Sequence, residues 1–287
     1  MCLIPLAKSI VMIRMVLFSV CLNLPGWLFS QEHNLTKFWE TDTLLKVPES
    51  VLLDAGNKIL YASNIDGTDP WAKDGRGSIA KVGLDGKIIN PEWVKGLHAP
   101  KGMGLYKNML YVADVDRVVL IDVTKGIIGQ IIQVEGAGGL NDISINKDGV
   151  VYVSDSKNKK LYRIENGVPS VFIENLKGPN GVLAQQQNLY ILDNGGAYKV
   201  NPDKTLSMIT DGMEGGTDGI ENVLGNDFIV SCWSGVIYYL KADGTKEKLL
   251  DTREQKINSA DIAYDAVNRI VYVPTFWKNN IVAYKLR

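Results

Sequence analysis

Polar side chains stand at the same place in successive units of this sequence, each just before an apolar run. Each unit contains a Tyr or Phe in its second β-rich run, which we call the landmark of the unit. Counting back from the landmarks gives Glu49, Lys101, Asn141, Asn180, Asp218 and, in the last unit, Ala260 or Asp261. Carboxylate and amide oxygens suit a hard divalent cation, which takes oxygen ligands and keeps several waters. Without a cation, Glu49 and Asp218 would repel one another and one would bind a proton. A fold that brings these residues together would therefore hold a metal ion.

A simpler explanation exists for any single Asn or Asp before a strand, because its side chain can bond to the backbone of a turn. Glu49 argues against this explanation, since Glu has no strong turn preference. A second polar series follows each landmark by three residues, and we expect it to bond to turns at the far end of each hairpin. This series contains Asn64, Asp114, Asp155, Asp193, Ser231 and Thr275.

The elements that must position these residues repeat along the chain. The landmarks are Tyr61, Tyr111, Tyr152, Tyr190, Phe228 and Tyr272, spaced by 50, 41, 38, 38 and 44 residues. Short β-rich runs fill each unit, and turns such as Asp85-Gly86, Asp148-Gly149 and Asp243-Gly244 separate them. This period is typical of four-stranded propeller blades. The sequence therefore predicts an all-β, six-bladed β-propeller whose first strands meet around a central channel.

The two ends of the chain complete the predicted ring. The last unit holds only about three strands, and the aromatic and β-branched run 37–45 stands outside the repeat. We expect this N-terminal strand to close the last blade, which removes an exposed edge. The longest spacing falls around residues 66–77, a Gly- and Asp-rich stretch with one Trp. It is predicted to be a surface insertion near the channel mouth, because it lacks the glutamate of a calcium loop.

Residues 1–30 differ from the rest of the chain, with Lys8 and Arg14 placed before an interrupted apolar run. This pattern predicts a signal peptide, followed by the propeller over residues 31–287, and a periplasmic or secreted protein without a membrane span. A lipid-anchored form is disfavoured, because Val20 stands where a small residue is expected before Cys21.

The composition of the chain limits the kinds of partner and of chemistry that we expect. Lys plus Arg number 31 and Asp plus Glu number 32, so the chain lacks the positive field that favours nucleic acid. Cys2 and Cys21 fall in the predicted signal peptide, which leaves Cys232 alone and excludes an intrachain disulfide after cleavage. Cys232 has no His nearby in sequence and no Gly-x-Ser-x-Gly motif is present, so covalent catalysis has little support.

Three short motifs resemble those of the SMP-30/gluconolactonase/LRE-like family of six-bladed propellers. They are Val47-Pro48-Glu49-Ser50, Pro179-Asn180-Gly181 and Thr217-Asp218-Gly219. The resemblance implies that Glu49, Asn180 and Asp218 hold one divalent cation, Ca²⁺ above all, with Zn²⁺, Mn²⁺ or Mg²⁺ as alternatives. It also implies that Asn141 contacts metal-bound water or substrate, and we place Lys101 with it as a substrate-binding residue.

The resemblance further implies a metal-dependent hydrolase that opens a lactone or simple ester with an activated water, with Asp218 as the catalytic base. This sequence departs from the family in two places: Ser50-Val51 follows the Glu, and Gly139 replaces an arginine two residues before Asn141. The alternative is a non-catalytic propeller of NHL type that binds a protein or carbohydrate, because the fold alone does not establish catalysis.

Overall fold

The computed structural model describes Met1 and residues 33–287, so the predicted signal peptide lies outside the described residues apart from Met1. Residues 33–287 form six antiparallel sheets of four strands each. The first three sheets contain, in chain order, β2 (Pro48–Asp54), β3 (Ile59–Asn64), β4 (Gly77–Gly83), β5 (Ile88–Leu97), β6 (Pro100–Tyr106), β7 (Met109–Asp114), β8 (Arg117–Asp122), β9 (Ile127–Gln133), β10 (Leu140–Ile145), β11 (Val151–Asp155), β12 (Lys160–Glu165) and β13 (Val168–Ile173).

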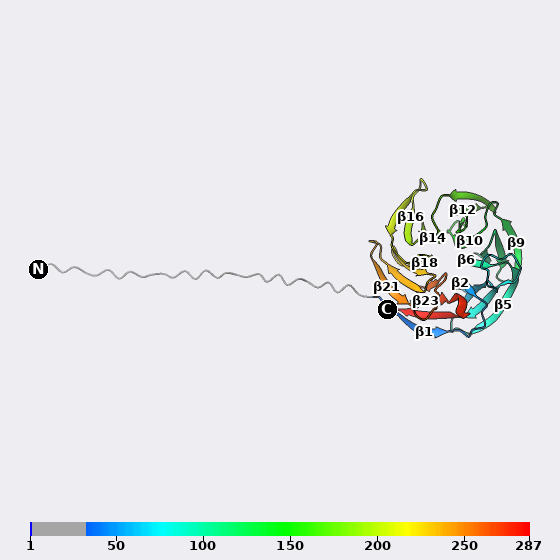
Figure 1. Ribbon diagram of the computed structural model, residues 1–287, viewed down its shortest axis with the longest axis horizontal. Helices are drawn as coiled ribbons and strands as arrows, with labels where there is room; N and C mark the ends of the chain where they lie inside the picture. Colours follow the sequence, from blue (N-terminus) through cyan, green and yellow to red (C-terminus); the bar gives the residue numbers. More distant parts are fainter. Residues whose placement is uncertain (2–32) are drawn as a thin grey trace. The chain divides into compact units, whose positions relative to one another are not determined.

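The other three sheets contain β14 (Pro179–Gln185), β15 (Asn188–Asp193), β16 (Gly196–Val200), β17 (Leu206–Thr210), β18 (Thr217–Leu224), β19 (Asp227–Cys232), β20 (Val236–Leu240), β21 (Lys246–Asp251), β22 (Ala263–Asp265), β23 (Ile270–Pro274), β24 (Ile281–Leu286) and β1 (Leu35–Glu40). A short 3₁₀ helix, η1 (Phe276–Lys278), lies between β23 and β24. Figure 1 shows the sheets around a ring, with β2, β6, β10, β14 and β18 toward its centre. The predicted six-bladed propeller is therefore confirmed.

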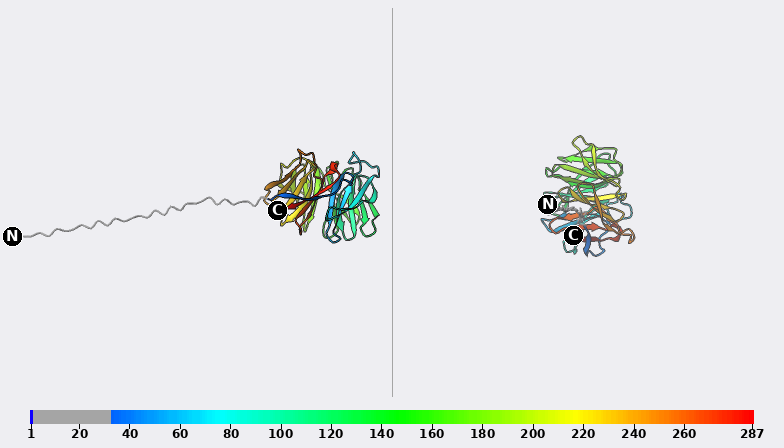
Figure 2. Two further views of the ribbon diagram at one scale, coloured as in Figure 1. Left: turned by 90° about the horizontal axis from the view of Figure 1, so that it is seen from below. Right: turned by 90° about the vertical axis from the view of Figure 1, so that its left-hand side faces the viewer.

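Local sequence explains each blade. All six aromatic landmarks lie in the second strand of their sheet, and Tyr61, Phe228 and Tyr272 are fully buried between blades. The predicted turns carry the left-handed backbone that glycine tolerates, with φ of 86° at Gly86 and 82° at Gly149. Figure 2 shows in its left view that the strands run between the two faces of the ring. Residues at strand ends therefore gather on one face or the other.

The N-terminal strand closes the last blade as predicted. β1 pairs antiparallel with β24, so the sheet order is β1-β24-β23-β22. Trp39 on β1 donates a hydrogen bond from Nε1 to Leu84 O at 3.0 Å, and its ring lies 5.6 Å from that of Tyr272. The strand is shorter than expected, because it ends at Glu40 and residues 43–47 turn toward β2.

One expectation about the second polar series is wrong. Pro48 pairs with Asn64, and Pro100 pairs with Asp114, so the end of each second strand lies beside the start of the first. The physical reason is the antiparallel pairing of a hairpin, which puts the first strand's start and the second strand's end at the same edge. The expected bonding to turns does occur, since Asp114 accepts the backbone N–H groups of His98 and Ala99.

Candidate functional site

The five polar residues expected at the channel mouth line one pocket of about 310 Å³. Each is the second residue of its blade's first strand: Glu49 on β2, Lys101 on β6, Asn141 on β10, Asn180 on β14 and Asp218 on β18. In all five strands the pairing register shifts just after the first residue. Such bulges re-aim a side chain and release it from the ladder. The repeated bulge thus presents all five side chains to one pocket.

The sixth position differs from the expectation. Neither Ala260 nor Asp261 lines this pocket. Asp261 instead accepts a hydrogen bond from Ser50 Oγ at 2.6 Å, and it lines a separate cavity in the channel with Asp142 and Glu221. The cause is local, since β22 begins only at Ala263 and Asp261 makes an isolated parallel bridge with Ser50.

The pocket floor contains two buried carboxylates. Glu49 and Asp218 are 4% and 2% exposed. Asn180 Nδ2 donates to Asp218 Oδ1 at 2.9 Å, and Lys101 Nζ lies 3.4 Å from Glu49 Oε1. Within residues 33–287, the buried oxygens Glu49 Oε2 and Asn180 Oδ1 have no hydrogen-bond partner. A buried acceptor without a partner is costly, so these two oxygens mark a place for a ligand that accepts electron pairs.

The electrostatics of the floor favour a cation. Burial raises the pKa of Asp218 well above its usual range, and the charges of Glu49 and Asp261 raise it further. Burial also raises the pKa of Glu49, although the ammonium of Lys101 opposes this shift. Each carboxylate is therefore less readily ionised than in water, and a positive ion between them would favour the charged forms.

The donor set fits the predicted ion. Among the residues that the structure describes, no group of three or more His, Cys, Asp or Glu side chains is placed to hold a metal. The expected set contains only two such residues, Glu49 and Asp218, and adds the amide oxygen of Asn180. Three oxygen donors without sulfur or imidazole suit Ca²⁺ or Mg²⁺ better than Zn²⁺. Metal binding by these residues stays a prediction.

The sequence did not reveal most of the pocket wall. Aromatic rings form much of this wall, which consists of Pro70, Trp71, Gly216, Trp233, Phe276 and Trp277. Trp71 lies in the insertion that was expected to border the mouth, between β3 and β4. Trp233 follows β19, and Phe276 and Trp277 lie in η1. These positions have no counterpart in the repeat, so only the three-dimensional arrangement shows that they meet.

A lysine from another turn occupies the space beside Gly139. A Cβ atom at Gly139 would lie 2.7 Å from Cβ and Cγ of Lys157. The Lys157 ammonium reaches the pocket wall, 4.8 Å from the centre of the Trp71 ring. Positive charge therefore reaches the pocket mouth although the expected arginine is absent.

Cys232, the free cysteine in the described part of the chain, has no role as a nucleophile. It is fully buried on β19, and burial raises the pKa of its thiol to about 12. A thiol with this pKa is protonated at neutral pH and reacts slowly. In the same part of the chain, no helix is long and apolar enough to cross a membrane.

Fold and pocket together define a class: a six-bladed propeller with an oxygen-lined pocket at one mouth of its channel. No protein-family model matches this chain, and no curated protein matches it by sequence. Its structural neighbours include propellers of the SMP-30/gluconolactonase family at low sequence identity.

A gluconolactonase from Xanthomonas campestris is 14% identical, with a TM-score of 0.65 over 85% of this chain and 87% of its own. Virginiamycin B lyase from Staphylococcus aureus is 15% identical, with a TM-score of 0.61 over 88% of this chain and 99% of its own. A chain of a nidogen–laminin complex is 16% identical, with a TM-score of 0.62 over 73% of this chain and 82% of its own. These similarities establish the fold.

Proposed function

We propose that this protein is a metal-dependent hydrolase of a lactone or simple ester. Glu49, Asn180 and Asp218 would hold one divalent cation, and their three oxygen donors favour Ca²⁺. The observation that carries the proposal is the pair of unpartnered buried oxygens, Glu49 Oε2 and Asn180 Oδ1, on the same pocket floor as Asp218. Similarity to gluconolactonase and lyase propellers supports an enzyme on this fold.

A bound cation would polarise the carbonyl and lower the pKa of an attacking water. Asp218 is the group that would take the proton from that water, because its carboxylate lies in the same pocket as the proposed ion and the ion would keep it charged. Lys101 brings positive charge to the floor, where it would stabilise negative charge that develops on the carbonyl oxygen. Asn141 is held by a hydrogen bond from Nδ2 to Ser156 Oγ at 3.0 Å and would orient the substrate.

The test is hydrolysis of a lactone panel before and after metal removal. Treatment with a chelator should abolish hydrolysis, and added Ca²⁺ should restore it. Asp218→Asn should lower kcat by about 100-fold or more, because it removes both a ligand and the base. Asp148→Asn makes the same chemical change in an exposed turn and should leave kcat unchanged. A wild-type protein that hydrolyses no lactone or ester with any divalent ion would refute the proposal.

The alternative, a propeller that binds a protein or carbohydrate without catalysis, is consistent with the neighbour from the nidogen–laminin complex. A binding face has no need for Glu49, a buried carboxylate with one oxygen unpartnered by the described residues. This observation favours the hydrolase.

We also propose a periplasmic or secreted location from the basic and apolar N-terminal sequence, and N-terminal sequencing of the exported protein would test it.

A further inference from the structure

We infer that the aromatic wall of the pocket selects a lactone or ester that carries an aromatic or other apolar substituent, rather than a polyhydroxylated sugar lactone. The aromatic wall is defined as Trp71, Trp233, Phe276 and Trp277. The inference rests on the proposed function and names its substrate class. It begins from the two kinds of group that line the pocket, which are charged and amide side chains, most of them buried, and aromatic rings, two of them half-exposed.

Three rings of the wall interlock. The Trp233 and Phe276 rings meet edge-to-face, with centroids 5.6 Å apart and planes at 81°. The Phe276 and Trp277 rings do the same, at 4.7 Å and 85°. Phe276 is buried, whereas Trp233 and Trp277 are 41% and 45% exposed. The buried ring therefore holds two half-exposed indoles in fixed positions beside the pocket.

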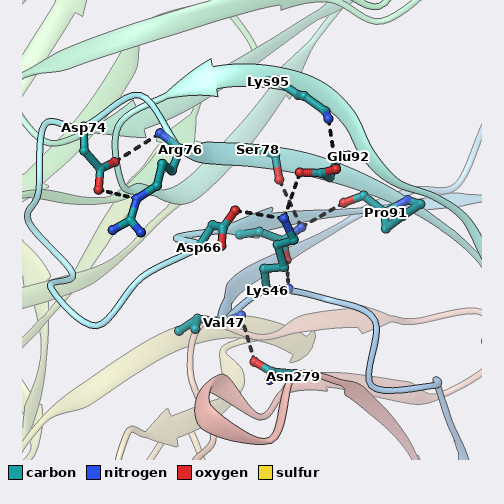
Figure 3. Close-up of polar contacts among 11 residues, drawn as sticks. Lys46, Val47, Asp66, Asp74, Arg76, Ser78, Pro91, Glu92, Lys95 and Asn279 are labelled. Atoms are coloured by element: carbon teal, nitrogen blue, oxygen red, sulfur yellow. Dashed lines mark hydrogen bonds and ion pairs between the residues drawn. The ribbon is translucent and has the colours of Figure 1, made fainter.

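The backbone under these rings is held in an unusual conformation. Phe276 has φ of 53°, a left-handed value that is strained for a residue with a side chain. Nearby Val47, two residues before Glu49, has φ of 59° and donates its backbone N–H to Asn279 Oδ1 at 3.0 Å. Figure 3 shows this bond between the chain entering β2 and the loop that follows η1. Such strain persists where the surrounding structure fixes it, and it is common at ligand sites.

Ion pairs hold the two ends of the insertion that carries Trp71. Lys46 Nζ lies 3.0 Å from Asp66 and 3.1 Å from Glu92, and Asp74 pairs with Arg76 at 2.7 Å (Figure 3). The ammonium groups of two lysines also face the Trp71 ring, Lys101 at 4.5 Å and Lys157 at 4.8 Å from its centre. These cation–π contacts orient the ring at the pocket.

A polyhydroxylated substrate would find few partners in this wall. Proline, glycine and phenylalanine side chains offer no hydrogen-bonding groups, so the three indole N–H groups are the donors of the wall. On the floor, the two oxygens without a partner among residues 33–287, Glu49 Oε2 and Asn180 Oδ1, are the ones assigned to the cation, and the other groups pair with one another or with Ser156. Several sugar hydroxyls buried there would outnumber these donors and would lose bonds to water that the wall replaces only in part, which disfavours binding. An aromatic or alkyl substituent would instead cover Trp233 and Trp277 and bury apolar surface.

The experiment compares three six-membered lactones that all open to an alkoxide: δ-valerolactone, which releases a primary alkoxide, and δ-phenyl-δ-valerolactone and δ-gluconolactone, which both release a secondary one. For the Ca²⁺-loaded protein, kcat/KM should be at least about tenfold higher for the phenyl compound than for δ-gluconolactone. Trp277→Ala should lower kcat/KM for the phenyl compound roughly tenfold, mainly through KM. δ-Valerolactone has no ring substituent, so the same variant should lower its kcat/KM by a smaller factor than that of the phenyl compound. Phe38→Ala removes an exposed ring on β1, outside the pocket lining, and serves as the matched control.

A binding measurement separates this inference from the proposed function. 6-Phenylpiperidin-2-one, a lactam of the same shape that is not readily hydrolysed, should bind the wild type in calorimetry and bind Trp277→Ala and Trp233→Ala at least about tenfold more weakly. Absence of all hydrolysis with lactam binding intact would refute the hydrolase and leave the aromatic wall standing. A preference for δ-gluconolactone, or equal lactam binding by wild type and both Trp variants, would overturn the inference.

Discussion

At the scale of single residues, the pocket floor holds buried side chains of opposite charge, and the negative charges outnumber the positive one. Glu49 and Asp218 contribute two carboxylates, and Lys101, a residue that is only 2% exposed, contributes one ammonium. This ammonium neutralises only part of the negative charge, since Asp261 also acts on Asp218. A divalent cation would complete the neutralisation, but it must share Glu49 with Lys101.

Lys101 should therefore weaken metal binding. Lys101→Met removes an ammonium that lies 3.4 Å from Glu49 Oε1 and should raise Ca²⁺ affinity by roughly tenfold or more, because an ammonium paired with a ligand carboxylate repels a second cation that binds the same carboxylate. Calorimetry, or Tb³⁺ luminescence excited through the pocket tryptophans, measures the change. Lys157→Met, which removes an exposed ammonium over the same Trp71 ring, should leave the affinity nearly unchanged. Weaker ion binding by Lys101→Met would show that Lys101 supports the ion instead.

Residues that recur with the repeat could be predicted from the sequence. Asn180 and Asp218 stand at one position of the blade, and a shared position in a closed ring means a shared place in space. Trp233 and Trp277 could not be predicted in this way, because turns that occur once in the chain carry no period. Asp261 was misplaced for a related reason, since the last blade begins later than the count assumed.

At the scale of elements, β18 carries a second carboxylate, Glu221, which is half-buried and lines the channel cavity, and it is expected to make stability depend on pH. Burial, reinforced by the charge of Asp261, raises the pKa of Glu221 to about 8. The folded protein thus holds a proton that the unfolded chain releases above about pH 4.5. Stability from this group is full at low pH and falls as pH rises toward 8.

Glu221→Gln should remove that dependence. At pH 9 the variant should be more stable than the wild type by about 1–3 kcal/mol, and at pH 4 the two should be similar. Urea unfolding at both pH values measures the difference. An equal effect at pH 4 and pH 9 would mean that the carboxyl group does not titrate in this range.

The closing strand β1 is expected to stabilise the ring through Trp39. Trp39→Ala removes a ring packed on Tyr272 and a hydrogen bond to Leu84 O, so it should lower the free energy of unfolding by about 2–4 kcal/mol. Phe38→Ala, one residue away on the exposed face, should change it by less than about 0.5 kcal/mol. Chemical denaturation of both variants provides the comparison. Similar small effects would show that β1 contributes little to ring closure.

Blade number and closure were predictable because each strand's composition, turn and period agree. The residues at which strands begin and end were less predictable. For example, β1 ends at Glu40, whereas the sequence predicted a strand that continues to residue 45. After Glu40, Thr41 Oγ1 accepts a hydrogen bond from the backbone N–H of Ile281. This contact with the neighbouring strand, and not local propensity, fixes where β1 ends. The second polar series was placed at the wrong end of the channel. Asp193 pairs with Pro179, so this series lies at the same end as the first series.

At the scale of the whole molecule, the three expected ligands come from β2, β14 and β18, in three separate blades. An ion bound to all three would connect distant parts of the ring and stabilise only the folded state. Ca²⁺ at about 100 times its dissociation constant should add about 2.7 kcal/mol, which corresponds to a rise in Tm of about 5–10 °C for a domain of this size. Differential scanning calorimetry with and without Ca²⁺ measures this shift, and no shift at millimolar Ca²⁺ would contradict it.

The most direct test of the central claim is the number of divalent ions bound per chain. Calcium calorimetry and elemental analysis should give one ion for the wild type. Glu49→Gln combined with Asp218→Asn should bind none, while circular dichroism shows that the propeller is still folded. A wild-type protein that binds no divalent ion, or a folded double variant that binds one as tightly as the wild type, would contradict the account.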